Sequence, residues 1–71
     1  MTPLQQLIYN YILVHQPNCD LCISKAFGYD YNQYANSLCR QLFALNYISR
    51  NKGKCKNCNR NVLLNRININ E

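Results

Sequence analysis

The 71-residue chain has few acidic residues, a single histidine and no long uninterrupted apolar run. Its three acids stand against eight lysines and arginines, which gives a net charge of +5. Seven of these eight basic residues lie in the second half of the chain, where the only acid is Glu71. A basic excess of this kind indicates either a polyanionic partner or a surface that maintains solubility.

Without a long apolar run, neither a membrane span nor a signal peptide is predicted. Gln5, Gln6 and Asn10 interrupt the N-terminal stretch MTPLQQLIYNYILV, which has no basic segment before it and no small-residue cleavage site after it. We therefore expect a cytoplasmic protein with no membrane partner. In that reducing compartment, clustered cysteines more often bind a metal than form disulfides.

The scarcity of histidine also leaves little for catalysis. His15 has no partnered acid in view, so a nucleophilic cysteine would lack a general base. A redox CxxC motif would need a βαβ context, which the pattern of this chain does not provide. We expect no enzymatic activity and no small-molecule substrate.

The length and the 48% content of hydrophobic residues indicate one folded domain over residues 1–71, with residues 68–71 as a flexible tail. A core of this size rarely contributes more than roughly 3–5 kcal/mol without a disulfide, a metal or a partner subunit. A stabilising element is therefore expected.

The first helix is predicted to begin after Thr2, the N-cap residue, with Pro3 at its first position and Gln5 completing a capping box. It ends before Gln16-Pro17. Its apolar residues fall on one face at helical spacing, and we predict that this face enters the core: Leu4, Leu7, Ile8, Tyr11 and Val14.

Two further helices are predicted before the pattern changes. The second begins with Asn18 as N-cap, runs through Phe27 and ends at Gly28. The third is capped by Asp30 with Gln33 at N3. Its predicted core stripe contains Tyr31, Tyr34, Ala35, Leu38, Leu42 and Leu45.

Residues 47–50 and 61–67 are rich in β-branched and aromatic residues, which predicts an antiparallel hairpin with the segment NKGKCKNCNR as a long tip. Asn46 tolerates a positive φ and is the expected C′ residue of the third helix. The predicted fold class is mainly α with a small antiparallel hairpin.

Two CxxC pairs, Cys19 with Cys22 and Cys55 with Cys58, are a strong metal signal because zinc prefers four thiolate or imidazole ligands in a tetrahedron. We predict a structural zinc site of these four residues, since four protein ligands leave no position for water. Other interpretations stay open: Cys19 and Cys22 as buried core residues, or His15 replacing one thiolate. Cys39 is expected to pack in the core and is the reserve ligand.

The element order resembles that of small winged helix-turn-helix DNA-binding proteins. The resemblance is carried by CISKAFGYDYNQYANSLCRQLFALNYISR and the basic hairpin after it. Asn46, where glycine is commoner, and the cysteine pairs depart from the usual pattern. The resemblance implies three helices plus a wing, with the segment entering the second helix antiparallel to the last strand. Both cysteine pairs are then neighbours. One zinc ion bound by four thiolates would lower the net charge of the domain to about +3.

The outward residues of the third helix and the hairpin suggest duplex DNA as a partner, either in transcription regulation or in the targeting domain of a DNA-processing protein. Gln and Asn pair with adenine and Arg with guanine in the major groove, while cations of a wing contact phosphates. A polar solvent-facing helix and a solubilising loop are the ordinary alternatives. The predicted nucleic-acid residues are Gln33, Asn36, Ser37, Arg40, Arg50, Lys52, Lys54, Lys56 and Arg60.

The alternative function is a protein-interaction or dimerisation module on the same fold, acting as a homodimer or within a larger parent protein. Tyr9 and Leu13, spaced i,i+4, are expected to project away from the core stripe, with Ile12 on their flank. Scattered surface apolar residues would give the same pattern.

Overall fold

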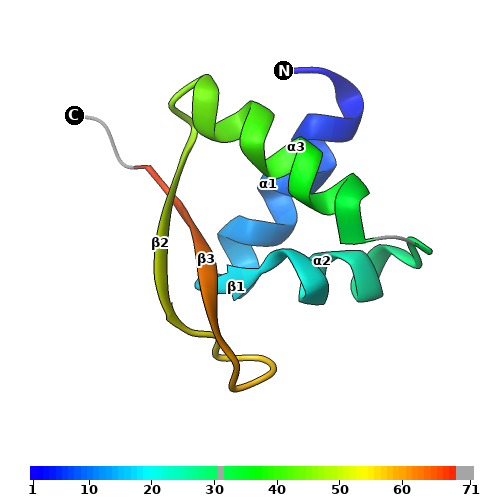
Figure 1. Cartoon of the computed structure of the whole chain (residues 1–71). Helices are drawn as coiled ribbons and strands as arrows, with labels where there is room; N and C mark the ends of the chain where they lie inside the picture. Colours follow the sequence, from blue (N-terminus) through cyan, green and yellow to red (C-terminus); the bar gives the residue numbers. More distant parts are fainter. Residues whose placement is uncertain (31, 69–71) are drawn as a thin grey trace.

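The computed structural model describes residues 1–30 and 32–68, and within these it contains three helices and a three-stranded antiparallel sheet (Figure 1). The elements are α1 (Pro3–His15), β1 (Asn18–Cys19), α2 (Asp20–Phe27), α3 (Asn32–Ala44), β2 (Ile48–Lys54) and β3 (Asn61–Ile67). The predicted combination of helices with a small antiparallel sheet is confirmed. Most of the tail predicted for residues 68–71 lies outside the described residues. None of the described helices is long and apolar enough to cross a membrane.

Three local signals end or begin helices as predicted. The Gln5 amide donates to Thr2 Oγ1 (3.1 Å) and the Thr2 amide donates to Gln5 Oε1 (3.0 Å), which completes the capping box of α1. Gly28 has φ 69° and closes α2, and Asn46 has φ 66° after α3. Because left-handed conformations cost little for glycine and are tolerated by asparagine, these residues set where the helices stop.

The start of α2 differs from the prediction. The helix begins at Asp20 with Cys19 as its N-cap, so Asn18 is not the cap. The reason is tertiary, because Asn18 and Cys19 pair with β3 and their backbone groups are engaged there. The N-cap predicted at Asp30 adjoins Tyr31, which lies outside the described residues.

The strands are arranged in the order β1-β3-β2. β2 pairs antiparallel with β3 from Ile48↔Ile67 to Lys54↔Asn61, and β1 pairs with the other side of β3. The predicted antiparallel neighbourhood of the segment entering α2 and the last strand is therefore confirmed. The strand predicted to end at residue 50 is longer, because cross-strand pairing extends it to Lys54 and leaves residues 55–60 as the tip.

The core lies between the helices and the base of the sheet. On α3, the predicted Ala35, Leu38 and Leu42 are buried, whereas Tyr34 and Leu45 are exposed and Tyr31 is not described. The main buried cluster contains Ile8, Ile12, Ile23, Ala35, Leu38, Cys39, Leu42 and Ile48.

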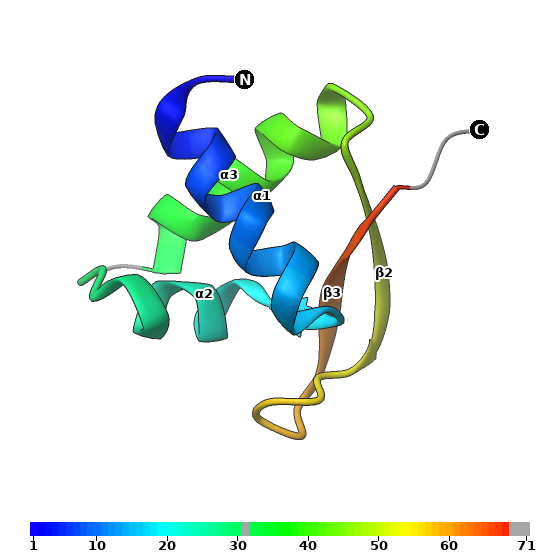
Figure 2. The same ribbon diagram turned by 180° about the vertical axis from the view of Figure 1, so that it is seen from behind.

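The buried face of α1 was predicted only in part, because Ile8 is buried and Tyr11 half-buried as expected but the other three predicted residues are exposed. Ile8 and Ile12 are fully buried, and Leu4, Leu7 and Val14 are 45%, 54% and 74% exposed. The helix is apolar on both sides, so spacing alone does not identify the inner one. In Figure 2, α1 lies in front of α3 with its outer side uncovered by other elements.

Candidate metal centre

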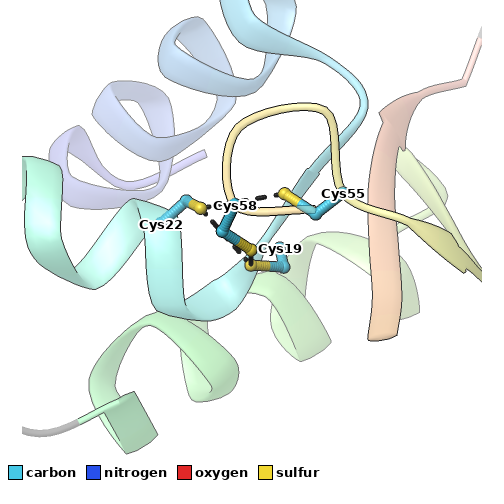
Figure 3. A group of neighbouring side chains, drawn as sticks. All are labelled: Cys19, Cys22, Cys55 and Cys58. Carbon is cyan, nitrogen blue, oxygen red and sulfur yellow. Dashed lines mark hydrogen bonds between the residues drawn. The ribbon is translucent and has the colours of Figure 1, made fainter. Parts of the chain in front are cut away.

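The four cysteines of the two CxxC pairs meet at one point, as Figure 3 shows. Their sulfur atoms all lie within 4.8 Å of one another. Three of the six separations are 3.5 Å between Cys19 and Cys22, 3.6 Å between Cys19 and Cys58, and 3.7 Å between Cys22 and Cys55. The predicted convergence of two pairs that are distant in sequence is confirmed.

These separations match metal coordination and not disulfide bonding. A disulfide holds its sulfurs about 2.05 Å apart. Four sulfurs at about 2.3 Å from a central ion, at the corners of a tetrahedron, are about 3.8 Å from one another. All five cysteines of the chain are free thiols. The four clustered sulfurs therefore form a site that could hold a metal ion.

The helical pair is positioned by the junction of β1 and α2. Cys19 ends the short strand and is also the N-cap of α2, while Cys22 lies in the first turn of the helix. Residues three apart on a helix lie on one face, so both sulfurs point the same way. The pairing Cys19↔Leu64 fixes this junction against β3.

The hairpin pair is positioned by a tight loop. The Cys55 amide donates to the Arg60 carbonyl oxygen and the Asn59 amide donates to the Cys55 carbonyl oxygen, each at 2.8 Å. Asn59 takes a positive φ of 61°, as its type predicts after a CxxC knuckle. The loop turns Cys58 back toward Cys55 and presents both sulfurs to α2.

The site is enclosed on two sides. Cys55 is fully buried and Cys19 nearly so, and Cys22 and Cys58 are half-buried. Leu64 packs against the cluster as part of a second small core beside the main one. A closed, four-thiol arrangement of this kind is typical of a structural metal site.

The electrostatics of the thiols differ between the two pairs. Burial raises the pKa of Cys19 and of Cys22. Burial acts in the same direction on Cys55, but the backbone amides of Asn57 and Cys58 donate to its sulfur and lower its pKa to about 6. Amide hydrogen bonds of this kind favour thiolate, the form that binds a metal.

The two alternative ligands lie elsewhere. Cys39 is fully buried in the main core, where burial and then the charge of Asp20 raise its pKa. The His15 side chain is exposed, and its ring lies on the ring of Tyr11 with centroids 4.4 Å apart. Neither belongs to the group of four sulfurs.

A buried polar network adjoins the site and was not predicted. Asp20, between the two ligands of the CDLC pair, forms an ion pair with Arg50 and accepts hydrogen bonds from Asn36 Nδ2 (2.8 Å) and Asn65 Nδ2 (2.9 Å). These partners come from β2, α3 and β3, so one carboxylate connects three elements to the start of α2. An acid between two cysteine ligands, in a chain with only three acids, is the sequence signal that could have identified it.

The network changes the interpretation of two predicted nucleic-acid residues. The Arg50 side chain is only 6% exposed and paired with Asp20, so its guanidinium faces the interior and not a phosphate. Asn36 is half-buried and donates to the same carboxylate. The other predicted residues are exposed: Gln33, Ser37 and Arg40 on α3, and Lys52, Lys54, Lys56 and Arg60 on the hairpin.

The predicted interaction residues are not one surface. Ile12 is fully buried in the core and cannot contact a partner. Tyr9 is half-buried, with its ring edge-on to Tyr47 at 6.1 Å. Leu13 is 50% exposed, as predicted for a surface residue. The error has the same origin as that in the core face, because α1 is apolar on both sides.

Comparisons with family models, curated proteins and solved structures gave no significant match.

Proposed function

We propose that this chain is a zinc-stabilised winged-helix module that binds duplex DNA. The observation that carries the metal half of the proposal is the group of four sulfurs within 4.8 Å. Tetrahedral sulfur sites suit zinc and iron, and a closed site with no open coordination position suits a structural zinc. Zinc bound there links the hairpin tip to the start of α2.

The winged-helix part of the proposal is supported by the topology of the chain. The order of three helices, a hairpin and a short strand between α1 and α2, with β3 central in the sheet, is the arrangement that the resemblance implies. In such domains α3 enters the major groove and the hairpin follows the backbone. On α3, Gln33, Ser37 and Arg40 lie opposite the buried stripe and are exposed.

The alternation of side chains along β2 supports a continuous cationic surface. Arg50 faces Asp20 and, through it, Asn36 of α3. Because side chains two residues apart share a face of a strand, Lys52 and Lys54 extend that same face beyond the helices, where both are exposed. We infer that they continue the surface of α3 out along the hairpin, as phosphate contacts would require.

The proposal is tested by titrating the zinc-loaded protein into labelled duplex DNA at low salt and measuring fluorescence anisotropy. We expect binding, and the logarithm of the association constant should fall linearly with the logarithm of the salt concentration. Lys52→Ala and Lys54→Ala should each reduce that slope by about 1. Arg66→Ala is the matched control, because Arg66 is exposed on the other face of β3. Affinity no higher than that of a neutral protein would refute DNA binding, while the zinc content, measured separately, tests the metal half.

A further inference from the structure

We propose that two copies of this chain associate through the outer face of α1. This face carries an apolar stripe, which we call the outer stripe, made of Leu4, Leu7, Tyr11 and Val14. At 100° per residue these side chains fall within about 80° of one another. Leu7 is 54% and Val14 is 74% exposed, although the opposite face of the same helix is buried in the core.

The spacing of the outer stripe fits another helix. Its residues recur at intervals of three, four and three, the pattern by which two helices pack along a common seam. No other element of the described chain covers this side of α1 (Figure 2). Among the stripe residues, Tyr11 is half-buried and packs against the main core, with its ring edge-on to the Phe27 ring at 5.5 Å, whereas Leu4, Leu7 and Val14 are exposed.

The charge distribution indicates what kind of helix fits. Every lysine, arginine, aspartate and glutamate of the chain lies at Asp20 or later, so α1 presents no formal charge before His15. The exposed polar groups beside the stripe are amides, with Gln6 Nε2 donating to Asn10 Oδ1 (3.0 Å). An acidic peptide or a nucleic acid would find no complementary charge here. The same helix of a second copy is neutral, equally spaced and therefore self-complementary about a two-fold axis.

Pairing through α1 also keeps the net charges apart. Four of the exposed cations of the hairpin lie on the segment from Lys52 to Arg60, at the end of the sheet farthest from the start of α1 in both views (Figures 1 and 2). Two positively charged copies can therefore meet on an uncharged surface.

The size of the surface predicts a weak dimer. A 13-residue helix is about 20 Å long, and its face is small against the roughly 800 Å² that each partner buries in a standard interface. An adjoining groove of about 450 Å³ begins at Leu4 and extends the apolar surface toward α3. We expect a dissociation constant in the micromolar range. The groove is lined by Leu4, Tyr29, Tyr34, Ser37, Leu38 and Gln41.

Sedimentation velocity of the zinc-loaded chain, from about 1 µM to about 1 mM, tests the proposal. A monomer–dimer equilibrium is expected, and Leu7→Glu should raise its dissociation constant at least tenfold. Gln6→Glu places the same charge on the same helix off the stripe, and Leu63→Glu places it on a leucine of β3 that is 43% exposed. Both should dimerise like the wild type.

A wild type that stays monomeric throughout, a Leu7→Glu variant that dimerises unchanged, or an equal loss in Gln6→Glu would overturn the proposal. Binding of the monomer to neutral lipid vesicles, abolished by Leu7→Glu, would also overturn it, because the occupant would then be a lipid surface. Circular dichroism of each variant verifies the fold, and the result is independent of DNA binding.

Discussion

Replacing Cys58 by serine is expected to unfold this domain or to detach the hairpin from the helices. A serine hydroxyl does not ionise at neutral pH and is a poor substitute for a thiolate ligand. The sulfur of Cys58 lies 3.6 Å from that of Cys19, so its loss removes the link between the tip and the start of α2 as well as one of four ligands.

The expected loss of stability follows from comparing the free energy contributed by the metal with that contributed by the core. Structural zinc sites in peptides show apparent binding free energies of roughly 10–16 kcal/mol at pH 7. A core of this size contributes only roughly 3–5 kcal/mol of net stability. If the loss of one of four ligands removes most of the metal contribution, the chain keeps little more than the roughly 3–5 kcal/mol of its core, and the fold becomes marginal. Chelation of the wild type removes the whole metal contribution and should destabilise the chain at least as much as Cys58→Ser does.

The assay is thermal unfolding followed by circular dichroism, together with elemental analysis of gel-filtered protein purified without chelator. The wild type should contain one zinc per chain and melt at a much lower temperature after chelation. Cys39→Ser is the matched control, because Cys39 is a buried cysteine outside the cluster. It should lose some stability but keep one zinc. Wild-type protein without metal, or a Cys58→Ser variant with the melting temperature of the wild type, would refute the reasoning.

Three further predictions concern residues away from the metal. Arg50→Met should lower the free energy of unfolding by about 3–5 kcal/mol in urea titrations, because it leaves the buried Asp20 carboxylate without its ion-pair partner. Adding Asp20→Asn to this variant should recover part of the loss. Equal stability of the single and double variants would contradict the importance of the ion pair. Burial raises the pKa of Cys39 above its usual value of 9.0. The contribution of the protonated thiol to stability is therefore complete below pH 9 and is lost as the pH rises toward the raised pKa. The free energy of unfolding should fall above pH 9 in the wild type and fall less in Cys39→Ala. Asn46 has a φ of 66°, a backbone conformation that suits glycine and strains a β-branched residue. Asn46→Gly should therefore raise the melting temperature slightly, and Asn46→Val should lower the free energy of unfolding by about 1–2 kcal/mol and the melting temperature with it. Equal melting temperatures for the two variants would contradict the role given to that backbone conformation.

The parts of the fold that sequence predicted are those set by local chemistry. The capping box at Thr2 and the left-handed residues Gly28 and Asn46 are determined within a few positions of the chain, and all were predicted correctly. The ligand pairs are also local, since each CxxC spacing brings two sulfurs to one side by itself. Their convergence needed only one tertiary relation, the antiparallel neighbourhood of β1 and β3.

The parts that sequence did not predict depend on choices between equivalent local patterns. Both faces of α1 are apolar, so the preference for Ile8 and Ile12 over Leu7 and Val14 is made by the shape of the space beneath the helix. From its residue type alone, Arg50 would be expected on the surface. It becomes an internal residue only because β1 brings Asp20, thirty positions earlier, against it.

The position of Asp20 would give a metal bound at the sulfur cluster a role beyond stability. The residue lies between Cys19 and Cys22, so the backbone that orients the ligands also orients the carboxylate. That carboxylate holds Arg50 of β2 and Asn36 of α3. A metal that fixes the start of α2 therefore also fixes the angle between the hairpin and α3. Because a two-stranded hairpin is marginally stable alone, a defined spacing between its lysines and the exposed face of α3 requires both the sulfur cluster and this ion pair.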